Sequence, residues 1–115
     1  MTLTTQDFSM VAGADKELRF TVRDPTTKLV VDLTSYAAEW RAVHQRDPTK
    51  TLELAGTIPV PADGVVVVTI DATATDNTDV GRWEHQLWLT DPTLNTDCGA
   101  SGTFSVRRAI ESTGP

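Results

Sequence analysis

Few residues of this chain are of types that could carry chemistry: two histidines, His44 and His85, and a single cysteine, Cys98. A catalytic histidine or cysteine needs an activating partner held close to it. The patterns HExxH, GxSxG, GxxxxGK and CxxC do not occur in the sequence. Cys98 falls in a predicted loop with no histidine near it, and we interpret it as a plain small residue. The sequence therefore predicts a protein that is not an enzyme and binds no cofactor.

His85 is the histidine that the sequence pattern places inside the protein. Apolar or aromatic residues alternate with polar ones from Trp83 to Leu89, and His85 falls in the inward set. Strict alternation is typical of a half-buried strand. We interpret His85 as a core histidine that is hydrogen-bonded to the backbone, and the alternative is an enzyme subunit that uses it in a cleft. His44 lies near the end of a predicted strand and is expected to be exposed.

Five aspartates are the candidate metal ligands. Carboxylates that converge from loops can bind calcium, which takes about 6–8 oxygen ligands. Their spacing matches no EF-hand loop, so we interpret them as turn-forming and capping residues and predict no metal site. If the expected strand order is right, they gather near one end of the protein. They are Asp71, Asp76, Asp79, Asp91 and Asp97.

Trp88 is the residue that says most about binding partners. It stands between Leu87 and Leu89, so the alternation predicts that its side chain lies on the outer face of the sheet. An outward tryptophan near arginine resembles the composition of interface hot spots. We therefore take Trp88, Arg82 and Arg107 as the candidate interface residues. Two alternatives are that Trp88 stacks on a sugar, or that a loop or the N-terminal arm covers it.

The overall charge narrows the class of partner. The chain has 115 residues and a formal net charge of −6. Binding to nucleic acid needs a basic surface that releases counterions, so no nucleic-acid partner is expected. No apolar run approaches the roughly 20 residues of a membrane helix, and the N-terminus lacks the basic and apolar regions of a signal peptide. We predict synthesis in a cytoplasm and no membrane partner.

Short alternating runs separated by turn signals, roughly every 8–12 residues, are the pattern of a β-sandwich. The run 36–44 also contains helix formers, but its neighbours on both sides are strands. We predict one domain over residues 1–115, with its core at about 6–109 and short terminal arms. The fold class is all-β, an immunoglobulin-like antiparallel β-sandwich of about seven strands with no disulfide. The expected strands are 6–11, 17–23, 36–44, 51–58, 65–71, 83–89 and 102–109, with a further short run at 29–33 and one turn of helix within 72–77. The expected core residues are Phe8, Leu18, Phe20, Val22, Trp40, Val68, Ile70, Trp83, His85, Leu87, Leu89, Phe104 and Val106.

Several short motifs, spread over about residues 7–106, resemble a known group of proteins. The motifs are Ala12-Gly13, the alternating run 17–24, Val31-Asp32-Leu33-Thr34, Ala38-x-Trp40, Gly81-Arg82-Trp83 and Gly102-x-Phe104-x-Val106. They resemble the N-terminal immunoglobulin-like domain of phage baseplate upper proteins and related small domains of phage tail and head proteins. In such folds a tyrosine often stands at the corner where Gly81 and Trp83 fall here.

The resemblance implies a structural protein of a phage particle that docks on other virion proteins. It implies a homo- or hetero-oligomeric assembly in the tail or baseplate, or on the capsid, and it implies a location in the virion. The alternative is a carbohydrate-binding β-sandwich module, which Trp88 and the loops rich in Asp and Asn favour.

Overall fold

The structure is a computed structural model that describes residues 4–24 and 26–110. Nearly all regular structure within these ranges is β-strand, because the alternation of apolar and polar residues has a period of two. Three short 3₁₀ helices are η1 (Pro61–Asp63), η2 (Ala72–Ala74) and η3 (Asn77–Asp79). The strands are β1 (Thr4–Thr5), β2 (Phe8–Val11), β3 (Lys16–Thr21), β4 (Ala37–His44), β5 (Thr51–Ala55), β6 (Val65–Ile70), β7 (Gly81–Thr90) and β8 (Thr96–Arg107).

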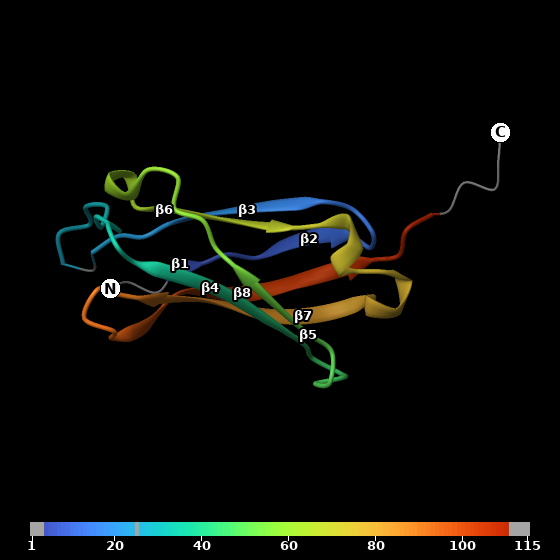
Figure 1. The fold of residues 1–115 in the computed structure, drawn as a ribbon. Coiled ribbons are helices and arrows are strands. Elements are labelled where there is room, and N and C mark those ends of the chain that lie inside the picture. The colour runs from blue at the N-terminus through green and yellow to red at the C-terminus, as the bar shows by residue number, and fades with distance from the viewer. Residues whose placement is uncertain (1–3, 25, 111–115) are drawn as a thin grey trace.

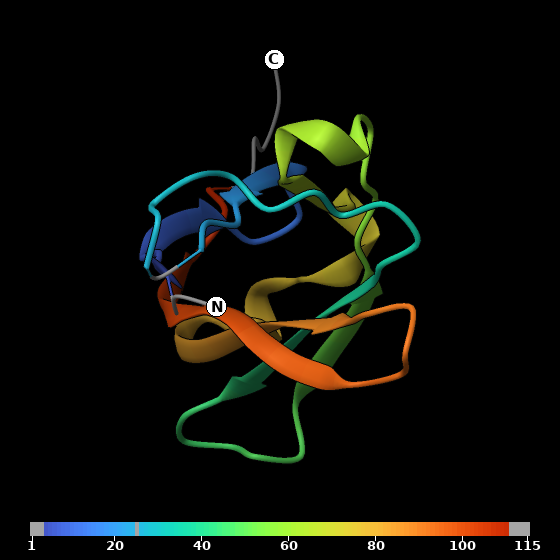
Figure 2. The same cartoon turned by 90° about the vertical axis from the view of Figure 1, so that its left-hand side faces the viewer.

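The strands form two sheets that pack face to face. The larger sheet has the order β1-β8-β7-β4-β5, with β2 also paired to β8, and the smaller sheet contains β3 and β6. Figure 1 shows β3 and β6 above and the larger sheet below, and Figure 2 shows the same two layers from the end. Separation of β3 and β6 from the other strands is the arrangement of an immunoglobulin-like sandwich. The predicted all-β sandwich without a disulfide is confirmed.

The sequence predicted a wholly antiparallel sandwich, and this part of the prediction is wrong. The N-terminal strands β1 and β2 both pair with β8 in the parallel sense. Between them, Gln6 donates its backbone N–H to Ser101 of β8 at 2.9 Å. The segment passes over Gly102, where a Cβ atom would stand 2.1 Å from the Gln6 carbonyl oxygen. Asp7 is anchored there, because its carboxylate accepts the backbone N–H of Thr103. The first strands of the chain therefore extend the larger sheet beside its last strand.

Several predicted strand bounds are wrong. The strand predicted at 17–23 ends at Thr21, and the strand predicted at 51–58 ends at Ala55. β8 begins at Thr96 rather than near Gly102, so Asp97 and Cys98 are strand residues and not loop residues. The reason is the long hairpin with β7, in which Trp88 pairs with Cys98 and a bulge accommodates the extra residue at Gly99. The run 29–33 forms only an isolated bridge at Val30. The predicted terminal arms lie largely outside the described residues.

One apolar core fills the space between the sheets. All the predicted core residues are buried except Phe8, which is partly buried against the core. Sequence reasoning did not place Leu33 or Val66 in this core, although both are buried. Leu33 follows an irregular segment without alternation, and Val66 belongs to a run of four valines in which the inward residues cannot be told apart by type. In the part of the chain that the structure describes, no helix is long and apolar enough to cross a membrane.

Candidate docking face

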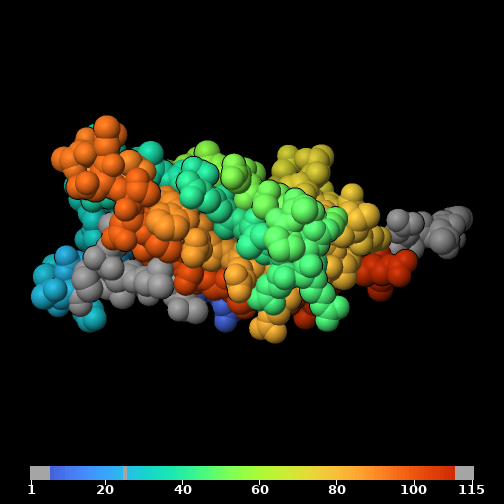
Figure 3. All heavy atoms as spheres, turned by 90° about the horizontal axis from the view of Figure 1, so that it is seen from below, coloured from blue at the N-terminus to red at the C-terminus, as the bar shows by residue number. Residues whose placement is uncertain are grey.

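The outer face of the larger sheet is the surface on which the candidate residues lie. Alternation along β4, β7 and β8 sends every second side chain away from the core. We use the name docking face for the outward residues of these strands around Trp88. They are Glu39, Arg41, Val43, Glu84, Gln86, Trp88, Ser101 and Thr103. Figure 3 views the molecule from this side, below the larger sheet of Figure 1.

Trp88 and Arg41 form the most organised contact on the docking face. The guanidinium of Arg41 lies over the indole ring of Trp88, 5.6 Å from the ring centroid. The same guanidinium binds Glu39, with Nε 2.9 Å from the carboxylate. The indole Nε1 donates to the amide oxygen of Gln86 at 3.2 Å. Each group on this patch is thus held by a neighbour, and Trp88 remains only partly buried.

The register of β4 against β7 creates this contact. Glu39 stands opposite Trp88, and Arg41 stands opposite Gln86, so Arg41 reaches diagonally to the indole. Hydrogen bonding from Arg41 holds the pKa of Glu39 below its usual range. This carboxylate is therefore charged at neutral pH and keeps the guanidinium in place beside Trp88.

The structure does not bring Arg82 or Arg107 to Trp88. Arg82 lies six residues before Trp88 on β7, which is about 20 Å along a strand. Arg107 lies at the same far end, one residue beyond Val106, which pairs with Gly81. The arginine that contacts Trp88 is Arg41 of β4. The missing signal was the strand register, which alternation within single strands does not reveal.

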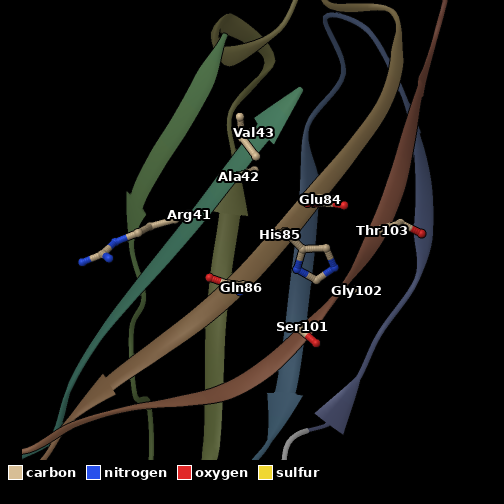
Figure 4. A pocket seen from close by; sticks show the side chains of 9 residues that line it. All are labelled: Arg41, Ala42, Val43, Glu84, His85, Gln86, Ser101, Gly102 and Thr103. Atoms are coloured by element: carbon tan, nitrogen blue, oxygen red, sulfur yellow. The ribbon is translucent and has the colours of Figure 1, made fainter. Parts of the chain in front are cut away.

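A shallow, open hollow of about 420 Å³ lies in the docking face next to this patch. Figure 4 shows that its lining residues come from β4, β7 and β8. In Figure 4, Arg41, Val43 and Gln86 lie on one side of the hollow, and Ser101 and Thr103 lie on the other. The hollow is therefore a concave surface of mixed polarity bordered by a fixed arginine.

His85 forms part of the wall of the hollow, but its imidazole ring points into the core. The side chain is 2% exposed, and Nδ1 accepts the indole N–H of Trp40 at 3.1 Å. Nε2 donates to the carbonyl oxygen of Gln6 at 2.6 Å. With Nδ1 accepting and Nε2 donating, the imidazole is neutral and carries its proton on Nε2. Both nitrogens are used, so the ring has no free position to act as a base.

The burial of His85 predicts a pH dependence of stability. Burial lowers the pKa of His85 below its usual value, although the Gln6 carbonyl and Asp7 oppose this shift. The unfolded chain titrates at about 6.5 and so binds a proton more readily than the folded protein. We expect the free energy of unfolding to fall as the pH drops from about 7.5 through 6.5 to 5. Urea denaturation at each pH measures this slope.

The matched variant for this test is His85→Gln, which has no titratable ring. Whatever its stability at neutral pH, this variant should show a shallower slope between pH 7.5 and 5 than the wild type. Carboxylates titrate around pH 4 and contribute equally to the two proteins, so the difference between the slopes reports His85. Equal slopes in the two proteins would contradict the inference that the fold holds His85 neutral.

His44 is buried, and the prediction of an exposed side chain is wrong. Its Nδ1 accepts the backbone N–H groups of Arg46 and Asp47, each at 3.1 Å. Its Nε2 lies 3.1 Å from the carbonyl oxygen of Val80 and donates to it. A Cβ atom on Gly81 would stand 2.7 Å from the same Nε2, so the glycine makes room for the ring. His44 ties the β4–β5 turn to the start of β7.

The five aspartates do not gather at one end of the sandwich. Asp76 and Asp79 precede β7, whereas Asp91 and Asp97 lie at the other end of this ten-residue strand. Among residues 4–24 and 26–110, no group of three or more His, Cys, Asp or Glu side chains is placed to hold a metal ion. The expectation failed because β7 is long enough to separate the loops at its two ends.

Two of these five, Asp76 and Asp91, instead build turns through an Asp-x-Thr pattern that also builds turns at three other aspartates. In five of the six Asp-x-Thr segments the carboxylate accepts the N–H of the residue two positions ahead, and usually the threonine hydroxyl as well. Hydrogen bonds from the nearby threonine residues hold the pKa of each of these aspartates below its usual range. The five instances begin at Asp24, Asp32, Asp47, Asp76 and Asp91.

Cys98 is half-buried at the bulge of β8. Its thiol donates to the carbonyl oxygen of Ala100 at 3.3 Å. Burial raises the pKa of the Cys98 thiol. Because the thiolate is the nucleophilic form, this position disfavours reactivity.

Comparison with known proteins adds a likeness of fold. No protein-family model matches the sequence, and no curated protein matches it at a significant level. Among solved structures, the fold is similar to the N-terminal domain of ORF48 of phage TP901-1, with a TM-score of 0.60. The match covers 92% of this chain and 85% of that chain, at 8% sequence identity. At this identity the comparison shows a shared fold.

Proposed function

We propose that this chain is a non-enzymatic structural protein of a phage virion that binds other virion proteins through the docking face. The similar fold of a phage protein domain supports the proposal. The resemblance of the sequence motifs to phage baseplate upper proteins is consistent with it. On this proposal the protein is a component of the tail, the baseplate or the capsid surface.

The observation that carries the proposal is the contact between Trp88 and Arg41. Tryptophan and arginine are, with tyrosine, the residue types enriched at interface hot spots. Here Arg41 is already held by Glu39 and Trp88, and the indole is held by Gln86. Side chains fixed before binding lose less conformational freedom when a partner covers them. The patch is therefore suited to a protein surface that carries an acidic or carbonyl-rich group opposite Arg41.

The test is the variant Trp88→Ala, assayed for folding and for incorporation into particles. Trp88 lies outside the core cluster, so we expect its loss to change the melting temperature little. Binding to the partner should weaken by about 2 kcal/mol, the margin of a hot spot. Thermal unfolding and mass spectrometry of purified particles measure the two effects on one variant.

Arg82→Ala is the matched control, because Arg82 is exposed on the same strand but far from Trp88. It should incorporate like the wild type. A Trp88→Ala protein that folds and assembles as well as the wild type would remove the docking face from the proposal. Purified particles that contain none of this chain would contradict the virion role itself.

A carbohydrate-binding module is the second candidate, because an outward tryptophan can stack on a sugar ring. The guanidinium of Arg41 already lies over the indole of Trp88. A sugar on that face of the indole would have to displace the guanidinium and break the ion pair between Arg41 and Glu39. The geometry thus favours a protein partner. A glycan array that gives a signal lost in Trp88→Ala would reverse this preference.

A further inference from the structure

The smaller sheet has an open edge along β3. Val22 donates its N–H to Gly64 at 2.8 Å, in the same register that pairs Phe20 with Val66 and Leu18 with Val68. In an antiparallel pair, successive residues direct their backbone groups to alternate sides. The N–H and C=O groups of Glu17, Arg19 and Thr21 therefore point away from β6. Within residues 4–24 and 26–110, no strand pairs with this edge.

From this edge we propose that two copies of the chain associate by antiparallel pairing of β3 with β3, around a two-fold axis at Leu18. Glu17 of each copy then stands opposite Arg19 of the other. These residues form hydrogen-bonded pairs, each of which exchanges both of its backbone N–H···O bonds. The pairing joins the smaller sheets of two copies into one four-stranded sheet. It lies on the opposite layer from the docking face, so it goes beyond the function proposed above.

The charges of β3 select both the partner and the register. Charged residues normally keep an exposed edge from pairing. On β3 the exposed charges alternate in sign, with Arg19 Nε 2.9 Å from the Glu17 carboxylate and both side chains more than half exposed. Symmetric pairing centred on Arg19 would oppose two arginines, and pairing centred on Glu17 would oppose two glutamates. Among these three registers, only the one centred on Leu18 pairs Glu17 with Arg19 on both sides of the axis and opposes no like charges within β3 (Lys16–Thr21).

The first experiment measures self-association of the full chain. Sedimentation equilibrium should show a monomer–dimer equilibrium at concentrations up to about 1 mM, a range that covers weak pairs. Amide hydrogen exchange should report the site, because Leu18 and Phe20 are protected by β6 in the monomer. The amides of Glu17, Arg19 and Thr21 should gain protection as the concentration rises. A chain that stays monomeric over this range, or a dimer without this protection, would overturn the proposal.

Charge reversal tests the register. Arg19→Glu places two glutamates from each copy, four in all, where the two β3 strands pair. This change should weaken the dimer at least about tenfold. Glu17→Arg should weaken it similarly, and the double variant Glu17→Arg/Arg19→Glu should restore it, since opposite charges face each other again. The two exchanged side chains are on the solvent side of the strand, so folding should be retained.

The matched control is Arg82→Glu, the same charge reversal at an exposed residue of the larger sheet that lies outside the docking face. It should leave the dimer unchanged. If the single reversals at β3 dimerise like the wild type, or if the double variant fails to recover while remaining folded, the pairing register is wrong. Protection of the β3 amides only when another protein is added would show that an extended segment of that protein occupies the edge instead.

Discussion

Replacing Trp83 by alanine should lower the free energy of unfolding by about 3–5 kcal/mol, through the transfer energy lost and the cavity left behind. Trp83 is 1% exposed and its ring stacks on Phe104, with centroids 5.7 Å apart. The ring of His44 meets it edge-on at 5.3 Å. A whole domain is stable by only about 5–15 kcal/mol, so this change removes a large share of the total. Urea denaturation measures it.

The indole N–H gives Trp83 a second role, at the corner before β7. It donates to the carbonyl oxygen of Asp79 at 2.9 Å. Asp79 also closes a capping box with Asp76 around η3. The bond from ring to upstream backbone is the one that a tyrosine makes at this corner of immunoglobulin-like folds. Trp83 therefore fixes the corner as well as filling the core.

The variant Trp83→Phe separates these two roles. Phenylalanine can keep an aromatic ring against Phe104 but leaves the Asp79 carbonyl without its donor. We expect a smaller loss, about 1–3 kcal/mol. A Trp83→Ala protein that melts within a degree or two of the wild type would show that the protein is stable without this side chain.

Gly102→Ala should lower the stability by about 3 kcal/mol, at the upper end of the range for overpacking. The new Cβ atom would stand 2.1 Å from the Gln6 carbonyl oxygen and 2.7 Å from its carbon, both of which are backbone atoms. The segment of Gln6 and Asp7 must therefore move. That movement breaks the bond from His85 Nε2 to Gln6 and loosens the parallel pairing of β2 with β8.

Thr103→Ala is the matched control for this prediction. It alters the next residue of β8, whose side chain lies on the outer face, and it keeps the backbone N–H that binds Asp7. Its stability should stay close to that of the wild type. Hydrogen exchange should show faster opening of β2 in Gly102→Ala and no such change in Thr103→Ala. Equal protection of β2 in both would mean that the N-terminal segment does not depend on the space at Gly102.

The sequence by itself determined the parts of the structure that depend on local pattern. Alternation along β7 was enough to send Trp83, His85 and Leu87 inward and Trp88 outward, because the side-chain period of a strand is two. The turns could also be predicted from the sequence, since an aspartate carboxylate can accept the backbone N–H of the residue two positions ahead. The all-β fold class and most of the buried core residues followed from these two patterns.

Tertiary structure alone decided which residues meet across strands. Arg41 reached Trp88 because of the register of β4 against β7, and that register depends on the packing of the whole sheet. His44 became buried because Gly81, far along the chain, leaves space for its ring. The parallel docking of β2 likewise depends on a glycine in β8. These contacts join residues that are distant in sequence, and no pattern within a single strand encodes the partner that lies beside it.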